Sequence, residues 1–170
     1  MGVALAVPGQ ALSDPRVAFS LTTQQGTVFT DRDIDGVPLA IFFGFTNCPD
    51  VCPTTLLQMT QDLEELGPDG DRIKVVFVSV DPERDTPAKL EAYMASFDPR
   101  IVALTGAADV IAAVARASGA SYRKVPTGDG YTIDHTASVF LLDRDGEYVG
   151  ALTFADERAA RLAKLRRLLP

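Results

Sequence analysis

Apolar and polar positions along the first third of the chain alternate in a way that predicts strands followed by a helix. Residues 17–21 alternate apolar and polar side chains, and residues 27–30 follow after Gln24-Gln25-Gly26, which is typical of a β-hairpin. Residues 37–45 are almost continuously apolar, as in a buried strand. Residues 54–66 then carry apolar side chains at helical spacing.

The remaining two thirds continue the pattern. Residues 73–80 are β-branched and nearly all apolar, which predicts a central strand covered on both faces. Thr86 and Pro87 form a good N-terminus for a helix that ends near residue 97. The pattern then predicts a strand at 101–104, a helix at 107–118, extended chain at 121–125, a loop at 127–130, a hairpin of 138–142 and 148–153, and a helix at 156–169. This order indicates an α/β domain with a mixed sheet and helices on both faces.

The pattern gives a simple domain organisation. Residues 1–15 have no periodicity and are expected to be a flexible leader, whereas residues 16–170 form a single domain. No apolar stretch is long enough to span a bilayer, and the short apolar run near the start lacks the charged beginning of a signal peptide.

Composition narrows the partners but does not identify any. Hydrophobic residues make up 46% of the chain and charged residues 23%, as in ordinary soluble proteins. The formal net charge of -7 disfavours nucleic acid and anionic lipid surfaces.

The candidate chemistry lies in the two cysteines, Cys48 and Cys52, between the strand at 37–45 and the helix at 54–66. Such a junction is a favoured ligand site in open α/β sheets. Residues four apart on a helix share a face, so both thiols can converge, and the helix N-terminus favours thiolates. Their Cα atoms would be about 6 Å apart, near the upper limit for a disulfide. Copper(I), zinc and an internal disulfide are all compatible with this pair.

His135 is the only histidine and is expected at the start of a late strand. Neighbouring Asp134 is a candidate to orient its imidazole. A separation of 83 residues from Cys52 means that only the fold can bring the two together (135 − 52 = 83).

Three motifs resemble those of the Sco/SenC family of copper-binding assembly factors for cytochrome c oxidase. They are the segments 48–53 (CPDVCP), 81–87 (DPERDTP) and 134–136 (DHT). The resemblance implies a thioredoxin-like fold with an extra N-terminal β-hairpin, and copper bound by Cys48, Cys52 and His135. It also implies a location on the periplasmic side of the inner membrane, with a tether through an N-terminal anchor that this sequence lacks. The implied partners are the copper-containing subunit of cytochrome c oxidase and another copper chaperone.

The chemistry of Cys48, Cys52 and His135 agrees with a copper site but leaves other metals and functions open. Two thiolates and one imidazole suit copper(I), whereas structural zinc usually takes four protein ligands. The charged loop 81–87 either ends a strand and caps a helix, or docks a partner near the site. For function, a copper metallochaperone is the first hypothesis.

A thiol–disulfide oxidoreductase that keeps the copper-ligand cysteines of a partner reduced is the alternative function. Cys48 and Cys52 would then be catalytic, although thioredoxins have two intervening residues where this chain has three. A peroxidase-like activity ranks third. Whether the protein is an enzyme therefore stays open at this point.

Overall fold

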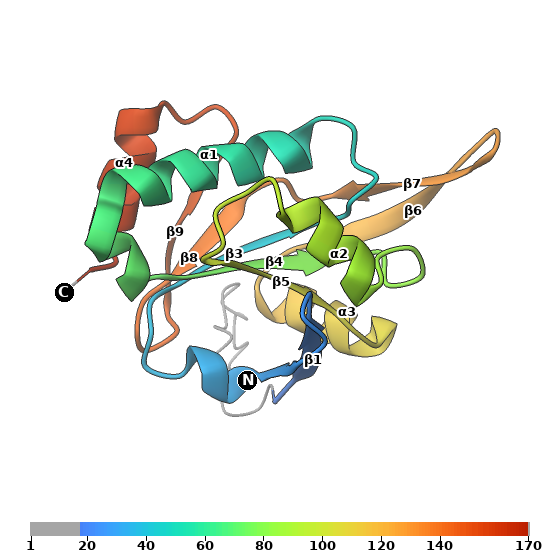
Figure 1. The fold of residues 1–170 in the computed structure, drawn as a ribbon, viewed down its shortest axis with the longest axis horizontal. Coiled ribbons are helices and arrows are strands. Elements are labelled where there is room, and N and C mark those ends of the chain that lie inside the picture. Colours follow the sequence, from blue (N-terminus) through green and yellow to red (C-terminus); the bar gives the residue numbers. More distant parts are fainter. Residues whose placement is uncertain (1–17, 170) are drawn as a thin grey trace, which may run out of the picture.

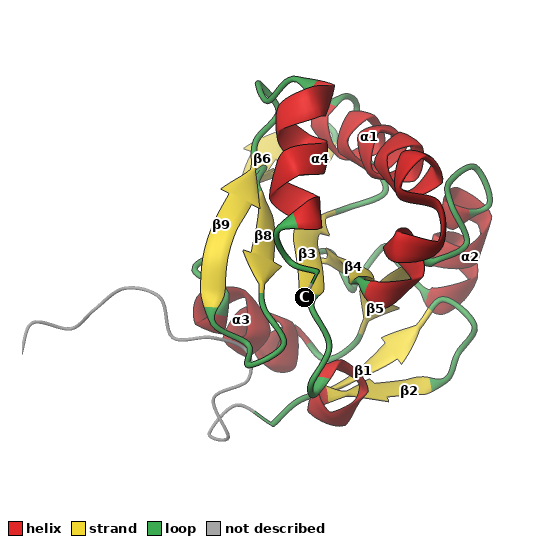
Figure 2. Cartoon of the chain, turned by 90° about the vertical axis from the view of Figure 1, so that its left-hand side faces the viewer, coloured by secondary structure: helices red, strands yellow, loops and turns green. Residues whose placement is uncertain are grey.

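The computed structural model describes residues 18–169, so the leader expected at 1–15 lies outside the described residues. A seven-stranded mixed sheet runs through the domain in the order β2-β1-β5-β4-β3-β8-β9 (Figures 1 and 2). Its strands are β1 (Ser20–Thr23), β2 (Val28–Thr30), β3 (Leu39–Gly44), β4 (Lys74–Ser79), β5 (Ile101–Thr105), β8 (Val139–Leu142) and β9 (Tyr148–Leu152).

The middle of the sheet is parallel and buried. β3 and β5 flank β4 in parallel, whereas β1 pairs antiparallel with β5, and β8 pairs antiparallel with β3. Five of the six residues of β4 are buried, which confirms the prediction of a central strand covered on both faces. The expected hairpins β1–β2 and β8–β9 are also confirmed.

Helices cover both faces of the sheet, as the alternating pattern predicted. They are α1 (Val51–Leu66), α2 (Pro87–Met94), α3 (Ala108–Ala117) and α4 (Arg158–Arg166). Figures 1 and 2 show α1, α2 and α4 on one face and α3 on the other. The buried side chains of Arg161 and Asp62 form a two-pronged ion pair that joins α4 to α1. Short 3₁₀ helices follow β2 (Asp31–Ile34) and α1 (Gly67–Arg72).

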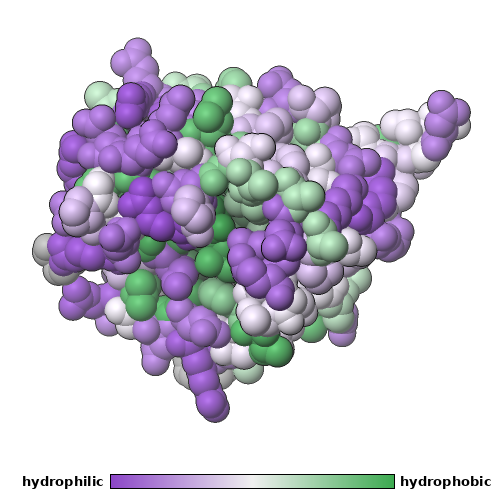
Figure 3. Space-filling view, viewed as in Figure 1, coloured by the Kyte–Doolittle hydropathy of each residue, from purple (hydrophilic) through white to green (hydrophobic). Residues whose placement is uncertain are grey.

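A second sheet consists of two strands only, β6 (Tyr122–Thr127) and β7 (Gly130–His135), which we call the ribbon. It extends beyond the body of the domain, and its tip is hydrophilic (Figures 1 and 3). The sequence pattern predicted extended chain for 121–125 but a loop at 127–130, where the structure has a tight turn. His135 was expected at the start of a strand, and this was wrong, because it is the last residue of β7 and precedes β8. Most ribbon positions are exposed, so apolar alternation did not mark these strands.

Within residues 18–169, no helix combines the length and the apolar character that a membrane span requires. The helix N-terminus predicted at Thr86 is confirmed, since its hydroxyl accepts a hydrogen bond from the Lys89 N–H at 3.3 Å. Gly119 ends α3 in the left-handed conformation, with φ of 79°, as glycine allows without strain.

Candidate metal centre

The fold brings Cys48, Cys52 and His135 together. One ligand atom from each residue lies within 4.8 Å of the other two. The Cys52 Sγ and the His135 Nε2 are 3.4 Å apart, although 83 residues separate them along the chain. Within the described part of the chain, this is the one group of three or more histidine, cysteine or acidic side chains close enough to share a metal ion.

The two cysteines differ in exposure because they occupy different parts of the strand–helix junction. Cys52 lies in the first turn of α1 and is completely buried, whereas Cys48 precedes the helix and is partly exposed. The backbone N–H of Cys52 points at the Cys48 Sγ, at 3.5 Å. Both thiols are free, and the loop before α1 and the first turn of α1 present them to the same point.

Gly44, the last residue of β3, makes room for the Cys52 sulfur. A Cβ atom at this position would lie 2.7 Å from the Cys52 Sγ and 2.8 Å from Cε2 of Phe77, closer than such atoms approach in real structures. Sequence reasoning did not select this residue. A glycine that interrupts an apolar strand is the signal that would have found it, since it often marks a close approach.

His135 is oriented by backbone and aromatic contacts. Its Nδ1 lies 3.1 Å from the carbonyl oxygen of Thr136, which can only accept, so Nδ1 carries the proton and Nε2 presents its lone pair toward Cys52. The rings of Phe42 and Phe45 lie edge-on to the imidazole, at centroid distances of 6.2 and 5.8 Å.

Asp134 does not orient the imidazole, contrary to the expectation from sequence. Its carboxylate is exposed and pairs with Arg123 on the neighbouring strand at 3.0 Å. Consecutive residues of a strand point to opposite faces, so Asp134 points away when His135 points toward the cysteines.

The protein side of the site is apolar. Burial raises the pKa of the Cys52 thiol well above its ordinary value, which outweighs the lowering expected from a helix N-terminus. The Tyr93 hydroxyl is buried without a hydrogen-bond partner among the described residues. Burial, and then the nearby Cys52 and Cys48, raise the pKa of Tyr93 as well. A metal ion that binds Cys52 must therefore displace a proton that the folded protein holds tightly.

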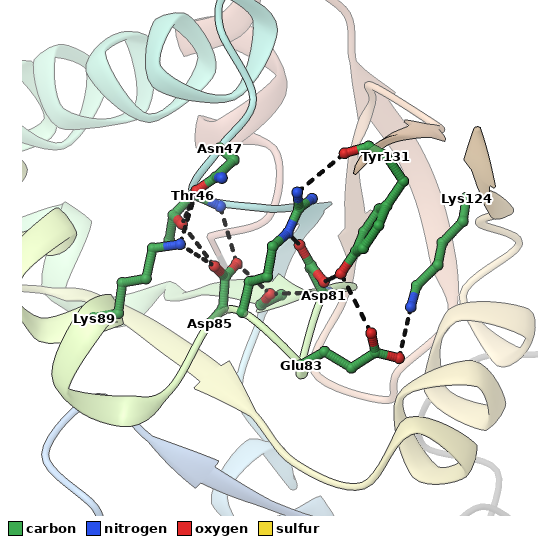
Figure 4. A network of polar contacts seen from close by, with 10 residues as sticks. Thr46, Asn47, Asp81, Glu83, Asp85, Lys89, Lys124 and Tyr131 are labelled. Carbon is green, nitrogen blue, oxygen red and sulfur yellow. Dashed lines mark hydrogen bonds and ion pairs between the residues drawn. The ribbon is translucent and has the colours of Figure 1, made fainter. Parts of the chain in front are cut away.

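The charged loop 81–87 lies between the cysteine loop and the ribbon (Figure 4). Asp85 accepts hydrogen bonds from the N–H and hydroxyl of Thr46 at 2.9 and 2.6 Å, and from the Ser79 hydroxyl at 2.6 Å. Asp81 pairs with Arg84 and accepts a hydrogen bond from the Tyr131 hydroxyl at 2.7 Å. The loop therefore caps α2, as expected, and also joins the two segments that carry the candidate ligands. Its expected role in docking a partner stays a prediction.

The donor set fits a soft metal ion. Two sulfur atoms and one neutral imidazole nitrogen suit copper(I), which accepts three ligands of this kind. Structural zinc usually requires a fourth protein ligand, and the group formed by the described residues contains three.

Comparison with known proteins points to one family. A family model described as SCO1/SenC matches residues 9–170. The human mitochondrial protein SCO1 homolog is 41% identical over 138 residues, covering 77% of this chain and 45% of its own length. Yeast mitochondrial protein SCO2 is 35% identical over 153 residues, covering 87% of this chain and 50% of its own length. The chain thus spans about half the length of these curated relatives.

Solved structures agree with this family assignment. Bradyrhizobium japonicum ScoI with copper bound is 45% identical, with a TM-score of 0.83, and the match covers 89% of this chain and 98% of that one. The thioredoxin-like fold that the sequence motifs implied, with its N-terminal β-hairpin, is confirmed.

Proposed function

The chain belongs to the SCO1/SenC family, and from this membership and its cluster of two thiols and one imidazole we propose that it is a copper metallochaperone. The metal ligands are Cys48, Cys52 and His135. The protein delivers copper to cytochrome c oxidase, or helps to mature the binuclear copper centre of that enzyme. The observation that carries the proposal is the convergence of these three donor atoms within 4.8 Å.

The geometry supports a carrier rather than a permanent copper site. Cys48 and His135 are partly exposed, so a partner can reach two of the ligands while Cys52 stays covered by protein. Oxidation of the two thiols to a disulfide would remove both sulfur ligands and release the metal. The protein then binds copper while both thiols are reduced, and transfers it to a partner that offers more ligands.

X-ray absorption on the reduced protein with one equivalent of copper(I) tests the ligand set. We expect two sulfur ligands and one nitrogen ligand in the wild type, loss of nitrogen in His135→Ala, and loss of one sulfur in Cys48→Ala. Ser118→Ala is the control, because Ser118 ends α3 on the opposite face of the sheet. Unchanged stoichiometry and affinity in Cys48→Ala and His135→Ala would refute the assignment.

The proposed partner is the copper-containing subunit of cytochrome c oxidase, with a second copper chaperone as the source of metal. We place the domain on the periplasmic side of the inner membrane, tethered to it by an N-terminal anchor. A strain that lacks the gene should assemble oxidase without its binuclear copper, and the wild-type gene but not the Cys48→Ala gene should restore it. Fusions to a periplasm-dependent reporter enzyme test the location.

A second function is favoured by one observation, the contact between the partly exposed Cys48 sulfur and the N–H of Cys52 at the start of α1. Such placement activates the attacking thiol of disulfide reductases. The protein would then reduce the copper-ligand cysteines of its partner. A midpoint potential too high to reduce a disulfide between those cysteines would exclude this function while leaving the metal site in place.

A further inference from the structure

The ribbon that carries His135 is attached to the domain along one face of β7. Its strands pair only with each other among residues 18–169 and are not part of the seven-stranded sheet. Three alternate residues of β7 contact the rest of the domain. The Tyr131 hydroxyl donates a hydrogen bond to Asp81, Ile133 is buried in the core, and the His135 Nε2 contacts the Cys52 sulfur. The position of His135 therefore depends on how firmly this face is held.

Arg84 contacts the ribbon at Tyr131 in two ways. Its guanidinium lies over the Tyr131 ring, 3.9 Å from the centroid, and its Nη1 donates to the Tyr131 carbonyl oxygen at 3.0 Å. A planar guanidinium can stack with its face while it donates from its edge, which an ammonium group cannot reproduce.

The body of the domain holds Arg84 in turn. Its Nε pairs with the fully buried carboxylate of Asp81, which also accepts the hydrogen bond from the Tyr131 hydroxyl. These contacts form a closed set in which Asp81, Arg84 and Tyr131 each touch the other two, and Figure 4 shows Asp81 beside the ring of Tyr131.

Arg84 also reaches the other end of the contact face. Its guanidinium lies 5.9 Å from the centroid of Phe45, and the Phe45 ring lies edge-on to the imidazole of His135. One side chain thus supports β7 four residues before His135 and supports an aromatic ring that packs on His135 itself.

We propose that Arg84 is a positioning residue for the metal centre, which holds β7 so that the His135 Nε2 stays opposite the Cys52 sulfur. The inference rests on the proposed function of the Cys48, Cys52 and His135 cluster. Without the guanidinium, Ile133 still anchors the middle of β7, and the Tyr131 hydroxyl and Lys124 keep their contacts with Asp81 and Glu83. The Tyr131 carbonyl, the Tyr131 ring and the Phe45 ring each lose a contact, so β7 is held less firmly beside His135. The imidazole then spends less time in place, and the metal is held by the two thiolates.

The test compares Arg84→Met, which keeps an unbranched side chain without the charge or the hydrogen-bond donors, with Arg84→Lys and Arg158→Met. Arg158 is a matched control because it forms an exposed ion pair with Glu65, away from the ligands. Each protein is loaded with one equivalent of copper(I) and examined by X-ray absorption and by competition for the metal. In the metal-free proteins, NMR records the contact between the His135 and Phe45 rings, with the Phe43–Phe140 contact as a reference for an intact core.

We expect Arg84→Met to keep both sulfur ligands, to lose nitrogen, and to bind copper(I) at least about tenfold more weakly, the size typical of residues that orient metal ligands. Its His135–Phe45 contact should weaken while the Phe43–Phe140 contact persists. Arg84→Lys should fall between Arg84→Met and the wild type, and Arg158→Met should match the wild type.

Suppose that the wild type binds copper(I) through nitrogen and that Arg84→Met keeps the same nitrogen ligand and the same affinity. This result would overturn the inference and leave the proposed function intact. A wild type without stable copper would refute the proposed function, and the NMR contact in the metal-free proteins would then decide whether Arg84 positions His135. If Arg84→Met does not fold, Arg84→Lys decides, because an unchanged nitrogen ligand and affinity in that variant would overturn the inference.

Discussion

Both carboxylate oxygens of Asp85 hold Thr46, a residue 39 positions earlier in the chain. Oδ2 accepts from the Thr46 N–H at 2.9 Å, and Oδ1 accepts from the Thr46 hydroxyl at 2.6 Å. Thr46 lies just after β3, two residues before Cys48, so a buried carboxylate in the loop after β4 determines where the cysteine loop begins.

Asp85→Asn should lower the free energy of unfolding by about 1–3 kcal/mol, because the amide replaces one of the two carboxylate acceptor oxygens with a donor and removes the charge that these hydrogen bonds stabilise. The same change should weaken copper(I) binding, since the cysteine loop loses its attachment. Asp69→Asn is the control: Asp69 is exposed and forms a surface ion pair with Arg72, so loss of its charge should have almost no effect. Denaturant unfolding and metal competition measure the two effects. Equal stability of both variants would contradict the role of Asp85.

Gly44→Ala should distort the site, because its Cβ would lie 2.7 Å from the Cys52 sulfur and 2.8 Å from the Phe77 ring. Overpacking of this kind costs about 1–3 kcal/mol of folding stability, and here it also pushes one candidate ligand away from the other two. Gly128→Ala in the ribbon turn is the control, since nothing lies within 4 Å of its added atom. Thermal unfolding and copper(I) affinity should change in Gly44→Ala and stay the same in Gly128→Ala.

The two thiols should react with iodoacetamide at very different rates in the metal-free protein. Cys48 is partly exposed, whereas Cys52 is completely buried and its pKa is raised by that burial, so thiolate is scarce there. Peptide mapping by mass spectrometry should find label on Cys48 long before Cys52 under native conditions, and on both in denaturant. Comparable native rates would show that the first turn of α1 opens freely.

The strands of the seven-stranded sheet and the helices that cover it were predictable, because their residues alternate between buried and exposed positions or form continuous apolar runs. The central strand β4 and the junction at Cys48 and Cys52 could be placed from such local patterns. The ribbon could not, because most of its side chains are exposed and its pairing depends on a turn that resembles an ordinary polar loop. The location of His135 at the end of a separate sheet followed from that pairing and was therefore missed.

Most contacts that support the site could not be predicted from the sequence. Those that tie the loop 81–87 to the rest of the site join segments far apart in the chain, as Asp85 joins Thr46 and as Arg84 joins Tyr131. Asp134 was chosen because it is adjacent to His135, yet adjacency in a strand places side chains on opposite faces. The candidate ligands were predicted because the two cysteines and the one histidine of this chain lie in motifs that resemble those of the Sco/SenC family.

The stability of the metal-free protein should fall as the pH rises above about 8.5, the ordinary thiol pKa, and Cys52 should account for much of this fall. In the folded protein, burial raises the pKa of Cys52, so its thiol stays protonated, whereas in the unfolded chain it releases a proton in this range. Higher pH therefore favours the unfolded state, and the contribution of Cys52 is complete below the unfolded pKa and is lost above it. The slope from one such group is about 1.4 kcal/mol per pH unit, which amounts to roughly 2 kcal/mol by pH 10.

Denaturant unfolding between pH 7 and pH 10, under reducing conditions, measures this effect. The measurements stop at pH 10 because burial also raises the pKa of Tyr93, which adds to the pH dependence of stability at higher pH. Cys52→Ala is less stable at every pH because it removes buried volume, so the comparison concerns the slope of stability against pH. Stability should fall less steeply with pH in Cys52→Ala, because the proton released by Cys52 on unfolding is absent. Cys48→Ala is the matched control, since it removes a thiol that is partly exposed. Parallel curves for the wild type and Cys52→Ala would mean that the Cys52 sulfur reaches solvent in the native state.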